Sequence, residues 1–481
     1  MRRELLLALD LGTTGVRALI VAETGVVLAR AYQPLSTVYP EPGWVEQNPE
    51  EMWERSLDVL REALSSAGIE ASALAGIGVV TQRGSAVAWD GRTGEPLAPV
   101  LSWQDQRTTE RVSGFRAKGI PLNTFASATK FEWWLENEPA VRKASSAGAL
   151  RLGTPETWLT FKLTGGSAHV TDPGNASCTA LYDLANGCWA DPLLKLFGVP
   201  REALPNIVPT SGVAGETPAS LLGGSVPVAA RAGDQQAAAF AQGVHAEGKA
   251  KLTLGTSGML DLHTGTEPAQ PVPGAYPLAL WRLSDGTQAC CLEGTVITTG
   301  AAVDWLVGLG LARDAAAVDR LAGECPDSEG VAFVPALQGL GTPFLDDRAT
   351  GLLGGMTRGT GVAHIARAVL DGVAHRCVDV CEALGLGDVP LRVDGGLARS
   401  EVLLQSLADL GGREVQRAAE TEATALGAAQ LAGLATSVFA SPEACQSTVE
   451  STTSFVPAWD RARRSRARER WGQVVARARS V

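Results

Sequence analysis

The stretch "LLLALDLGTTGVRALIVAETG", Leu5 to Gly25, reads as a buried strand that ends in a carboxylate and a turn of small residues. Asp10 closes the apolar run, and the turn Gly12–Gly15 follows it. Such a turn points consecutive backbone N–H groups and hydroxyls outward, which makes a nest for phosphate oxygens. A carboxylate reaches phosphate through a cation, and Mg²⁺ prefers one or two carboxylates with water and phosphate oxygens. The segment therefore indicates a phosphate and magnesium site, with a plain hairpin and a turn aspartate as the alternative.

The same arrangement recurs in "AKLTLGTSGMLDLHTG", Ala250 to Gly265. Both segments read as an apolar strand, a Gly-Thr-Thr/Ser-Gly turn, a second apolar strand and then Thr-Gly. This repeat predicts two related halves that each begin with a glycine-turned hairpin, the second starting near Gly243. A third segment, "VDGGLARS" from Val393 to Ser400, ends a strand in Asp-Gly-Gly, so that a flat ligand can lie against bare backbone. Together the three segments favour a nucleotide ligand.

The segment "AGDQQAAAF" places Asp234 after a glycine and before two glutamines, at the predicted start of a helix. Because aspartate is a favoured N-cap, helix capping alone would account for it. The functional interpretation is a general base that takes a proton from a substrate hydroxyl, with the neighbouring amides holding other hydroxyls. The segments "VTQRGSAVAWD" and "LSWQDQRT" add Arg83 and Trp103, which suit a small polar ligand with an apolar flank.

Alternating strand and helix patterns connect these segments. In "EEMWERSLDVLREALSSAG" the large apolar residues have helical spacing, and Gly68 is the expected stop. Helices are also predicted for "GVAHIARAVLDGVAHRCVDVCEALG" and "SEVLLQSLADLGG", and a buried strand for "PLRVDGG". Strands that alternate with helices in both halves predict an α/β protein of two lobes.

The composition limits the classes of protein that fit. At 481 residues the chain is long enough for two domains. Its formal net charge of −11 argues against nucleic-acid and anionic membrane partners. The 8 cysteines form no paired CxxC framework, which predicts reduced thiols. The sequence shows no signal-peptide pattern. It also has no apolar run close to the roughly 20 residues that a membrane span needs, so a cytoplasmic protein is expected.

The C-terminal segment "WDRARRSRARERWGQVVARARSV" is rich in arginine. A basic helix that binds nucleic acid is one interpretation of this pattern. The acidic character of the whole chain favours the other, a solvated surface helix with Trp459 and Trp471 packed beneath it.

The order of these motifs along nearly the whole chain resembles the FGGY carbohydrate kinases of the actin/hexokinase/Hsp70 superfamily, and most of all their glycerol kinase branch. The motifs are "DLGTTGVRA", "GWVEQNPEEMW", "TQRGSAVAWD", "WQDQRT", "SATKFEWWL", "GDQQAAAFAQG", "LGTSGML", "GLLGGMTRGT", "DGG" and "ETEATALGAAQLAG". The resemblance implies an α/β fold of two actin-like (ribonuclease H-like) lobes around a central cleft. It also implies an N-terminal substrate and phosphate lobe over residues 1–243, a C-terminal ATP lobe over 244–436, and a helical tail over 437–481 packed on the lobes.

The resemblance further implies a role for each matching residue. Asp10 would hold Mg²⁺ through water, and Asp234 would be the catalytic base. The substrate-binding residues would be Arg83, Gly84, Trp103, Phe125, Asp234 and Gln235. The ATP-binding residues would be Thr13, Thr14, Gly15, Arg17, Thr256, Gly300, Asp304, Gly396 and Ser400. With ATP and Mg²⁺ as cofactors, the implied activity is transfer of the γ-phosphoryl group to a primary hydroxyl of glycerol or a related polyol.

Some positions depart from the glycerol kinase pattern. Gly84 and Phe125 stand where those enzymes usually carry glutamate and tyrosine. Asp304 and Ser400 stand at the positions of a glutamine and an asparagine near the nucleotide. Two hydrogen-bonding groups for glycerol hydroxyls are therefore missing. Their loss predicts a roomier pocket that prefers a longer polyol or ketose, whose extra carbon fills the space above Gly84.

Two alternatives to a glycerol kinase follow. A pentulose or tetritol kinase of the same family would use the roomier pocket. A catalytically idle regulator that binds sugar or nucleotide is the alternative from another class, although a binding protein has no need of the base Asp234. The small-molecule substrate is the expected partner, and a homodimer or homotetramer is left open.

Overall fold

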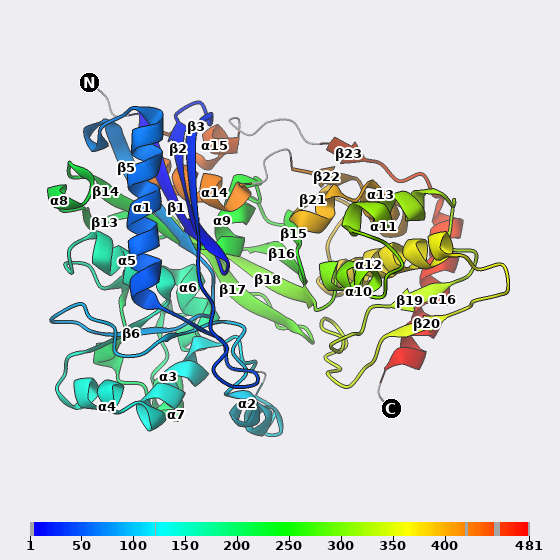
Figure 1. Ribbon diagram of the computed structural model, residues 1–481, viewed down its shortest axis with the longest axis horizontal. Coiled ribbons are helices and arrows are strands. Elements are labelled where there is room, and N and C mark those ends of the chain that lie inside the picture. Colours follow the sequence, from blue (N-terminus) through cyan, green and yellow to red (C-terminus); the bar gives the residue numbers. More distant parts are fainter. Residues whose placement is uncertain (1–3, 121, 419–421, 447–452, 480–481) are drawn as a thin grey trace.

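The computed structural model describes residues 4–120, 122–418, 422–446 and 453–479, which form two α/β lobes side by side (Figure 1). Each lobe is built around one large mixed sheet. In the first sheet the strand order is β13 (Ser211–Glu216), β14 (Pro227–Gly233), β5 (Leu74–Thr81), β1 (Leu5–Leu11), β2 (Gly15–Ala22) and β3 (Val27–Pro34). In the second it is β17 (Ala275–Arg282), β18 (Gln288–Val296), β16 (Gly258–Gly265), β15 (Ala250–Leu254), β21 (Leu391–Asp394), β22 (Val415–Arg417) and β23 (Thr453–Phe455).

The two sheets repeat one plan. β1 pairs with β2 in antiparallel and with β5 in parallel orientation, and β15 pairs with β16 and β21 in the same two ways. β14 and β22 then continue the parallel run on β5 and β21. Both predicted glycine-turned hairpins therefore stand at matching places in the two sheets, and the predicted fold of two actin-like lobes is confirmed.

Helices and short strand pairs surround the sheets. The helices before residue 250 are α1 (Pro49–Ala67), α2 (Thr109–Arg116), α3 (Ser127–Asn137), α4 (Pro139–Ser146), α5 (Pro155–Leu163), α6 (Pro173–Cys178), α7 (Asp191–Phe197), α8 (Ala219–Leu222) and α9 (Asp234–Ala241). The later helices are α10 (Gly300–Gly308), α11 (Ala315–Gly323), α12 (Val362–Ala383), α13 (Glu401–Gly411), α14 (Ala423–Ala435), α15 (Pro442–Gln446) and α16 (Arg461–Ala478). The strand pairs are β4 (Glu46–Gln47) with β7 (Val100–Leu101), β6 (Val87–Asp90) with β8 (Leu150–Gly153), β9 (Val170–Thr171) with β12 (Asn206–Ile207), β10 (Tyr182–Asp183) with β11 (Cys188–Trp189), and β19 (Ala332–Val334) with β20 (Leu352–Gly354).

The structure contains the helices that were predicted from the spacing of apolar residues. Capping residues set the ends of these helices. α1 begins after Asn48, whose Oδ1 accepts the Glu50 N–H at 2.9 Å, and ends at Gly68, which has φ 64°. α13 begins after Ser400, whose hydroxyl accepts the Leu403 N–H at 3.1 Å. α12 spans the long predicted segment and buries its apolar residues in the core of the second lobe. Within the described residues, no helix combines the length and apolar character that a membrane crossing needs.

α14 comes from the second half of the chain but packs against the first sheet. It lies on β1, β5 and β14 and along α9, and Figure 1 shows it beside the blue strands of the first lobe. A Cβ on Gly427 would lie 1.9 Å from the carbonyl oxygen of Ala237, and one on Gly78 would lie 2.0 Å from that of Ala428. Only glycine permits so close an approach. The lobe boundaries at 243 and 436 stay a prediction, and α14 ties the two halves together.

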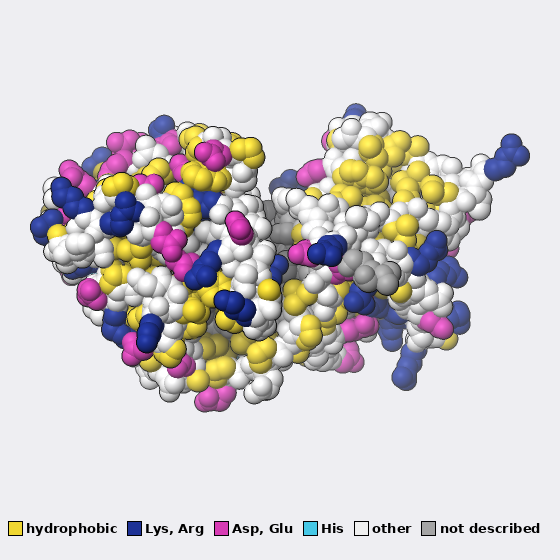
Figure 2. Space-filling view, turned by 90° about the horizontal axis from the view of Figure 1, so that it is seen from below, with side chains coloured by type: hydrophobic (Ala, Val, Ile, Leu, Met, Phe, Trp, Pro, Cys, Tyr) yellow, Lys and Arg dark blue, Asp and Glu magenta, His cyan; other side chains and the backbone are white. Residues whose placement is uncertain are grey.

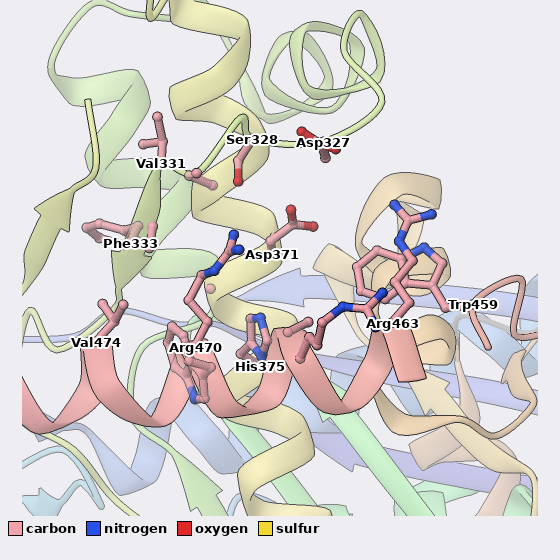
Figure 3. A pocket seen from close by; sticks show the side chains of 17 residues that line it. Asp327, Ser328, Val331, Phe333, Asp371, His375, Trp459, Arg463, Arg470 and Val474 are labelled. Carbon is pink, nitrogen blue, oxygen red and sulfur yellow. The ribbon is translucent and has the colours of Figure 1, made fainter. Parts of the chain in front are cut away.

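α16, the predicted arginine-rich helix, packs on the second lobe. Trp471 is buried, and its ring stacks on that of His375 with centroids 4.6 Å apart, which confirms tryptophan packing beneath a surface helix. A cavity of about 270 Å³ lies between α16, α12 and the loop before β19, and Figure 3 shows Trp459, Arg463 and Arg470 at its wall. Basic side chains at this end of the molecule are visible in Figure 2. The segments 447–452 and 480–481 of the predicted tail lie outside the described residues.

Replacing Gly427 with alanine should destabilise the protein through the contact of α14 with α9. The added Cβ would overlap the Ala237 carbonyl oxygen, and overpacking of this kind typically costs about 1–3 kcal/mol. Gly472→Ala in α16 is the matched control, because its Cβ meets no atom within 4 Å, and we expect it to stabilise the helix by about 0.5–1 kcal/mol. Thermal unfolding followed by circular dichroism measures both changes. Equal midpoints for the two variants would contradict close packing between α9 and α14.

Candidate active site

Predicted site residues meet at the carboxyl-terminal edge of the first sheet. The parallel register sets Leu11 beside Thr81 and Thr81 beside Gly233. The chain then continues into the glycine turn after β1, into Arg83 after β5, and into Asp234 at the start of α9. Because ligands of open α/β sheets bind outside the carboxyl ends of the strands, this register brings the predicted phosphate and acceptor groups together.

The first glycine turn joins β1 to β2. It is closed by a hydrogen bond from the Gly12 N–H to the Gly15 carbonyl oxygen at 2.9 Å. The Thr13 hydroxyl accepts the indole N–H of Trp103 at 2.9 Å and donates to Gln82 Oε1 at 3.2 Å. Trp103, predicted to face the substrate, therefore also fixes the turn predicted to receive phosphate.

Asp10 and Arg17 face each other at paired positions of β1 and β2. Arg17 Nε lies 3.6 Å from Asp10 Oδ2, and Arg17 Nη1 donates to Glu422 Oε2 at 2.6 Å. Burial raises the pKa of Asp10 to about 7, whereas Arg17 lowers it and the charge of Asp234 raises it. A buried carboxylate beside a phosphate nest fits a divalent cation, which would stabilise its charged form. Thr14, next in the turn, is exposed.

Asp234 is the first residue of α9, and its carboxylate is held from two sides. Oδ1 accepts the backbone N–H of Gln235 at 2.7 Å and the Nε–H of Arg83 at 3.2 Å. The Arg83 side chain is 3% exposed, whereas that of Asp234 is 35% exposed. Asp234 thus has a fixed direction and an open side, which is the arrangement that a general base requires.

Charged residues of the second sheet complete the surroundings of Arg83. Arg83 Nη2 lies 2.6 Å from Oε2 of Glu293, which stands opposite Asp261 on the neighbouring strand. Asp261 stands opposite Lys251, which donates to Gln235 Oε1 at 2.6 Å. Burial raises the pKa of Glu293 to about 7, whereas Arg83 lowers it and Asp261 raises it. Both lobes therefore contribute charge to one buried cluster.

Sequence reasoning missed Glu422 and the second-sheet charges Lys251, Asp261 and Glu293. The signal for the latter was present, because each is a charged residue in an otherwise apolar strand segment: "AKLTL", "MLDL" and "CCLEG". Charged side chains are almost never fully buried unless they are paired. Glu422 stands just before α14, and the residues that open its motif, 420–421, lie outside the described part of the chain.

The space above Gly84 is filled, so the expectation of a roomier pocket there is wrong. Gly84 has φ 71°, and a Cβ on it would lie 2.5 Å from the Phe125 carbonyl oxygen and 2.9 Å from the Phe125 ring. The buried Lys130 holds this loop by donating to the Phe125 carbonyl oxygen at 3.1 Å. The Phe125 ring also lies 5.7 Å from Arg83 Cζ and contacts Trp103 edge-on, with centroids 6.3 Å apart. Phe125 thus closes over Gly84.

The second glycine turn (Gly255–Gly258) is tied to the start of α10. The Thr256 carbonyl oxygen accepts the Ala301 N–H at 3.1 Å, and the Gly300 N–H donates to the Gly255 carbonyl oxygen at 2.9 Å. A Cβ on Gly300 would lie 2.6 Å from that same oxygen, so the contact requires glycine. The fold therefore brings Thr256 and Gly300, both predicted to bind ATP, to one place.

The other residues predicted to bind the nucleotide, Gly396, Ser400 and Asp304, differ in their surroundings. Gly395 has φ 91°, and a Cβ on it would lie 2.5 Å from a β15 carbonyl oxygen, so Gly395 and Gly396 present bare backbone that fits a flat ligand. The Ser400 hydroxyl donates to Asp319 besides capping α13. Asp304 is exposed on α10. Contacts of Gly396, Asp304 and Ser400 with ATP stay predictions.

A repeated actin-like fold, with a phosphate nest and a held carboxylate at one sheet edge, defines the class of two-lobed sugar kinases. Residues 5–241 match the N-terminal domain, and residues 250–436 the C-terminal domain, of the FGGY family of carbohydrate kinases. The chain belongs to this family. It is a phosphotransferase with an alcohol group as acceptor.

Glycerol and xylulose kinases are among the relatives that match. The chain is 44% identical to the glycerol kinase of Aromatoleum aromaticum over 98% of each chain. It is 40% identical to that of Deinococcus radiodurans, over 98% of this chain and 97% of the relative. The crystal structure of Plasmodium falciparum glycerol kinase with ADP has a TM-score of 0.93 at 28% identity, covering 98% of each chain. The xylulose kinase of Rhodospirillum rubrum has a TM-score of 0.85 at 27% identity, again covering 98% of each chain.

Replacing Gly84 with alanine should destabilise the acceptor side of the site. The new Cβ would strike the Phe125 carbonyl oxygen and would also meet the strain of φ 71°, and strain and overlap each cost about 1–3 kcal/mol. Gly148→Ala isolates the strain, because Gly148 has φ 67° and open space around it. Denaturant unfolding compares the two variants, and we expect the larger loss at Gly84. A smaller loss at Gly84 than at Gly148 would contradict the closure by Phe125.

Proposed function

We propose that the protein transfers the γ-phosphoryl group of ATP to a primary hydroxyl of glycerol, as its glycerol kinase relatives are named for doing. The observation that carries the proposal is the Asp234 carboxylate, which Arg83 and the Gln235 N–H fix at the same sheet edge as the first glycine turn. A proton acceptor and a phosphate nest at one edge are what transfer to an alcohol requires. The names of the relatives and the ADP-bound neighbour support the choice of glycerol and ATP.

Asp234 takes the proton of the attacking hydroxyl, which contributes about 10²–10⁴-fold to the rate. Arg83 keeps the carboxylate directed and lies beside the acceptor, with Gln235 as a further contact. The hydroxyl and backbone N–H groups of the first glycine turn, with Arg17, hold the transferred phosphate. Positioning and charge neutralisation supply most of the rate enhancement in such reactions. Asp10 would hold Mg²⁺, which supplies positive charge to the phosphate groups when bound.

The closed space above Gly84 favours a small acceptor over the pentulose or tetritol alternative. Phe125 covers this position through its backbone and its ring, so an additional carbon has no room there. A pentulose remains the second candidate because a xylulose kinase shares the fold at 27% identity. The ratio of kcat/KM for glycerol to that for xylulose distinguishes the two. The cytoplasmic location and the choice between homodimer and homotetramer stay predictions.

Asp234→Asn should abolish phosphoryl transfer while leaving nucleotide affinity unchanged. Asparagine keeps the size of the side chain but cannot take a proton, so we expect kcat with glycerol to fall by about 10²–10⁴-fold. A coupled assay of ADP formation measures the rate, and calorimetric titration with ATP measures binding. Asp58→Asn, at an exposed position of α1, serves as the matched control. Turnover of Asp234→Asn within about tenfold of wild type would rule out the base assignment.

A further inference from the structure

A buried ring of side chains joins the first two residues of α9 through the second sheet. The ring runs from Asp234 through Arg83, Glu293, Asp261 and Lys251 back to Gln235. Its members from the second sheet are all buried, and so is Arg83. The ring holds two cations and three carboxylates, so loss of one cation would leave a buried carboxylate without a partner. Lys251 and Asp261 have no part in the proposed chemistry, and their burial calls for a role.

Lys251 determines which way the Gln235 amide faces. Its ammonium is fully buried and donates to Gln235 Oε1 at 2.6 Å and to Thr253 Oγ1 at 2.8 Å, with Asp261 Oδ2 3.5 Å away. An ammonium can only donate, so the Gln235 amide must turn its oxygen toward Lys251. The two N–H donors of the amide then face away from Lys251. They find no acceptor among the described residues, and Gln235 is half-exposed.

Resting on the proposed function, we propose that Lys251 is a positioning residue for the phosphate acceptor, because it orients the Gln235 amide to donate to a hydroxyl oxygen of the polyol. Asp234, the neighbour of Gln235, accepts the proton of the hydroxyl that becomes phosphorylated. Gln235 therefore serves a second hydroxyl of the same small molecule. Asp261, directly opposite on β16, keeps the ammonium in place. The second lobe thus contributes to acceptor recognition through a residue that does not touch the acceptor.

Lys251→Met in the full-length protein tests this role by steady-state kinetics. Without the ammonium the amide is free to turn, so we expect the KM for glycerol to rise about tenfold or more, as for loss of one good hydrogen bond. We expect kcat and the KM for ATP to stay within about threefold, because the change affects acceptor binding. Lys249→Met is the matched control, since it makes the same substitution at an exposed position two residues earlier. An unchanged KM for glycerol, or the same rise in the control, overturns the proposal.

Two glycerol analogues separate positioning from a merely structural role. Propane-1,2-diol and propane-1,3-diol each keep a primary hydroxyl and lack one of the other hydroxyls of glycerol. The KM penalty of Lys251→Met should vanish for the diol that lacks the hydroxyl bound by Gln235 and persist for the other. In a Gln235→Met background, Lys251→Met should add nothing further to the KM. Equal penalties on all three acceptors, or additive effects in the double variant, overturn the proposal.

A second variant keeps the test decisive if Lys251→Met does not fold. Lys251→Met with Asp261→Asn removes one charge of each sign from the ring, and the same criteria apply to it. Failure of wild type to phosphorylate glycerol counts against the proposed function alone. The KM of the variant is then divided by that of the wild type, measured with whichever polyol or ketose the wild type phosphorylates. Alternatively, the two dissociation constants for glycerol are compared by calorimetry. If the variant and the wild type have equal KM or equal dissociation constants in that comparison, the proposed role of Lys251 is overturned.

Discussion

Burial of the Arg83 guanidinium between carboxylates of both lobes is the constraint on which the rest of the site depends. At 3% exposure the group has almost no contact with water, so Asp234 on one side and Glu293 on the other must balance its charge. The contact with Asp234 fixes the direction of that carboxylate, and the contact with Glu293 joins β18 to the loop that follows β5. Separating the lobes at this point would take Glu293 away from Arg83 and leave buried charged groups unpaired, so this contact favours keeping the two sheets together.

The position of Asp234, the proposed base, also depends on close packing behind it. α9 carries Asp234 at its first residue and lies along α14, where Gly427 allows the two helices to touch backbone to backbone. Protein interiors transmit small displacements because they are close-packed. Ahead of α14, Glu422 pairs with Arg17 beside Asp10. One helix from the second half of the chain therefore supports both Asp234 and the predicted phosphate side of the site.

The predicted acceptor and phosphate sides share residues rather than lying next to each other as separate sites. Trp103 donates to Thr13 in the first glycine turn, and its ring contacts Phe125, which closes over Gly84. A displacement of Phe125 thus reaches the first glycine turn through two contacts, one from Phe125 to Trp103 and one from Trp103 to Thr13. This coupling gives a physical reason for a small acceptor, since a bulky one would have to move Phe125 and with it the support of Trp103.

The local features of this protein were determined by its sequence alone. The glycine turns, the end of α1 at Gly68 and the repeat of two hairpins depend on residues close together in the chain, and they were predicted. The Asn48 cap at the start of α1 is equally local, and the structure added it. The grouping of Asp10 with Asp234 followed from the family resemblance. Only the tertiary structure decided that Glu293 partners Arg83, because a charge in an apolar strand shows that a partner exists but not which one.

The same reason explains the failed expectation at Gly84. Absence of a carboxylate in the sequence suggested free space, whereas packing placed Phe125 there, with Lys130 holding its carbonyl oxygen. Space in a folded protein is set by whatever segment packs into it, and that segment lies far along the chain. Residue type and spacing thus determined which chemical groups this protein has available. Long-range packing decided the direction of the Asp234 carboxylate and the space left above Gly84.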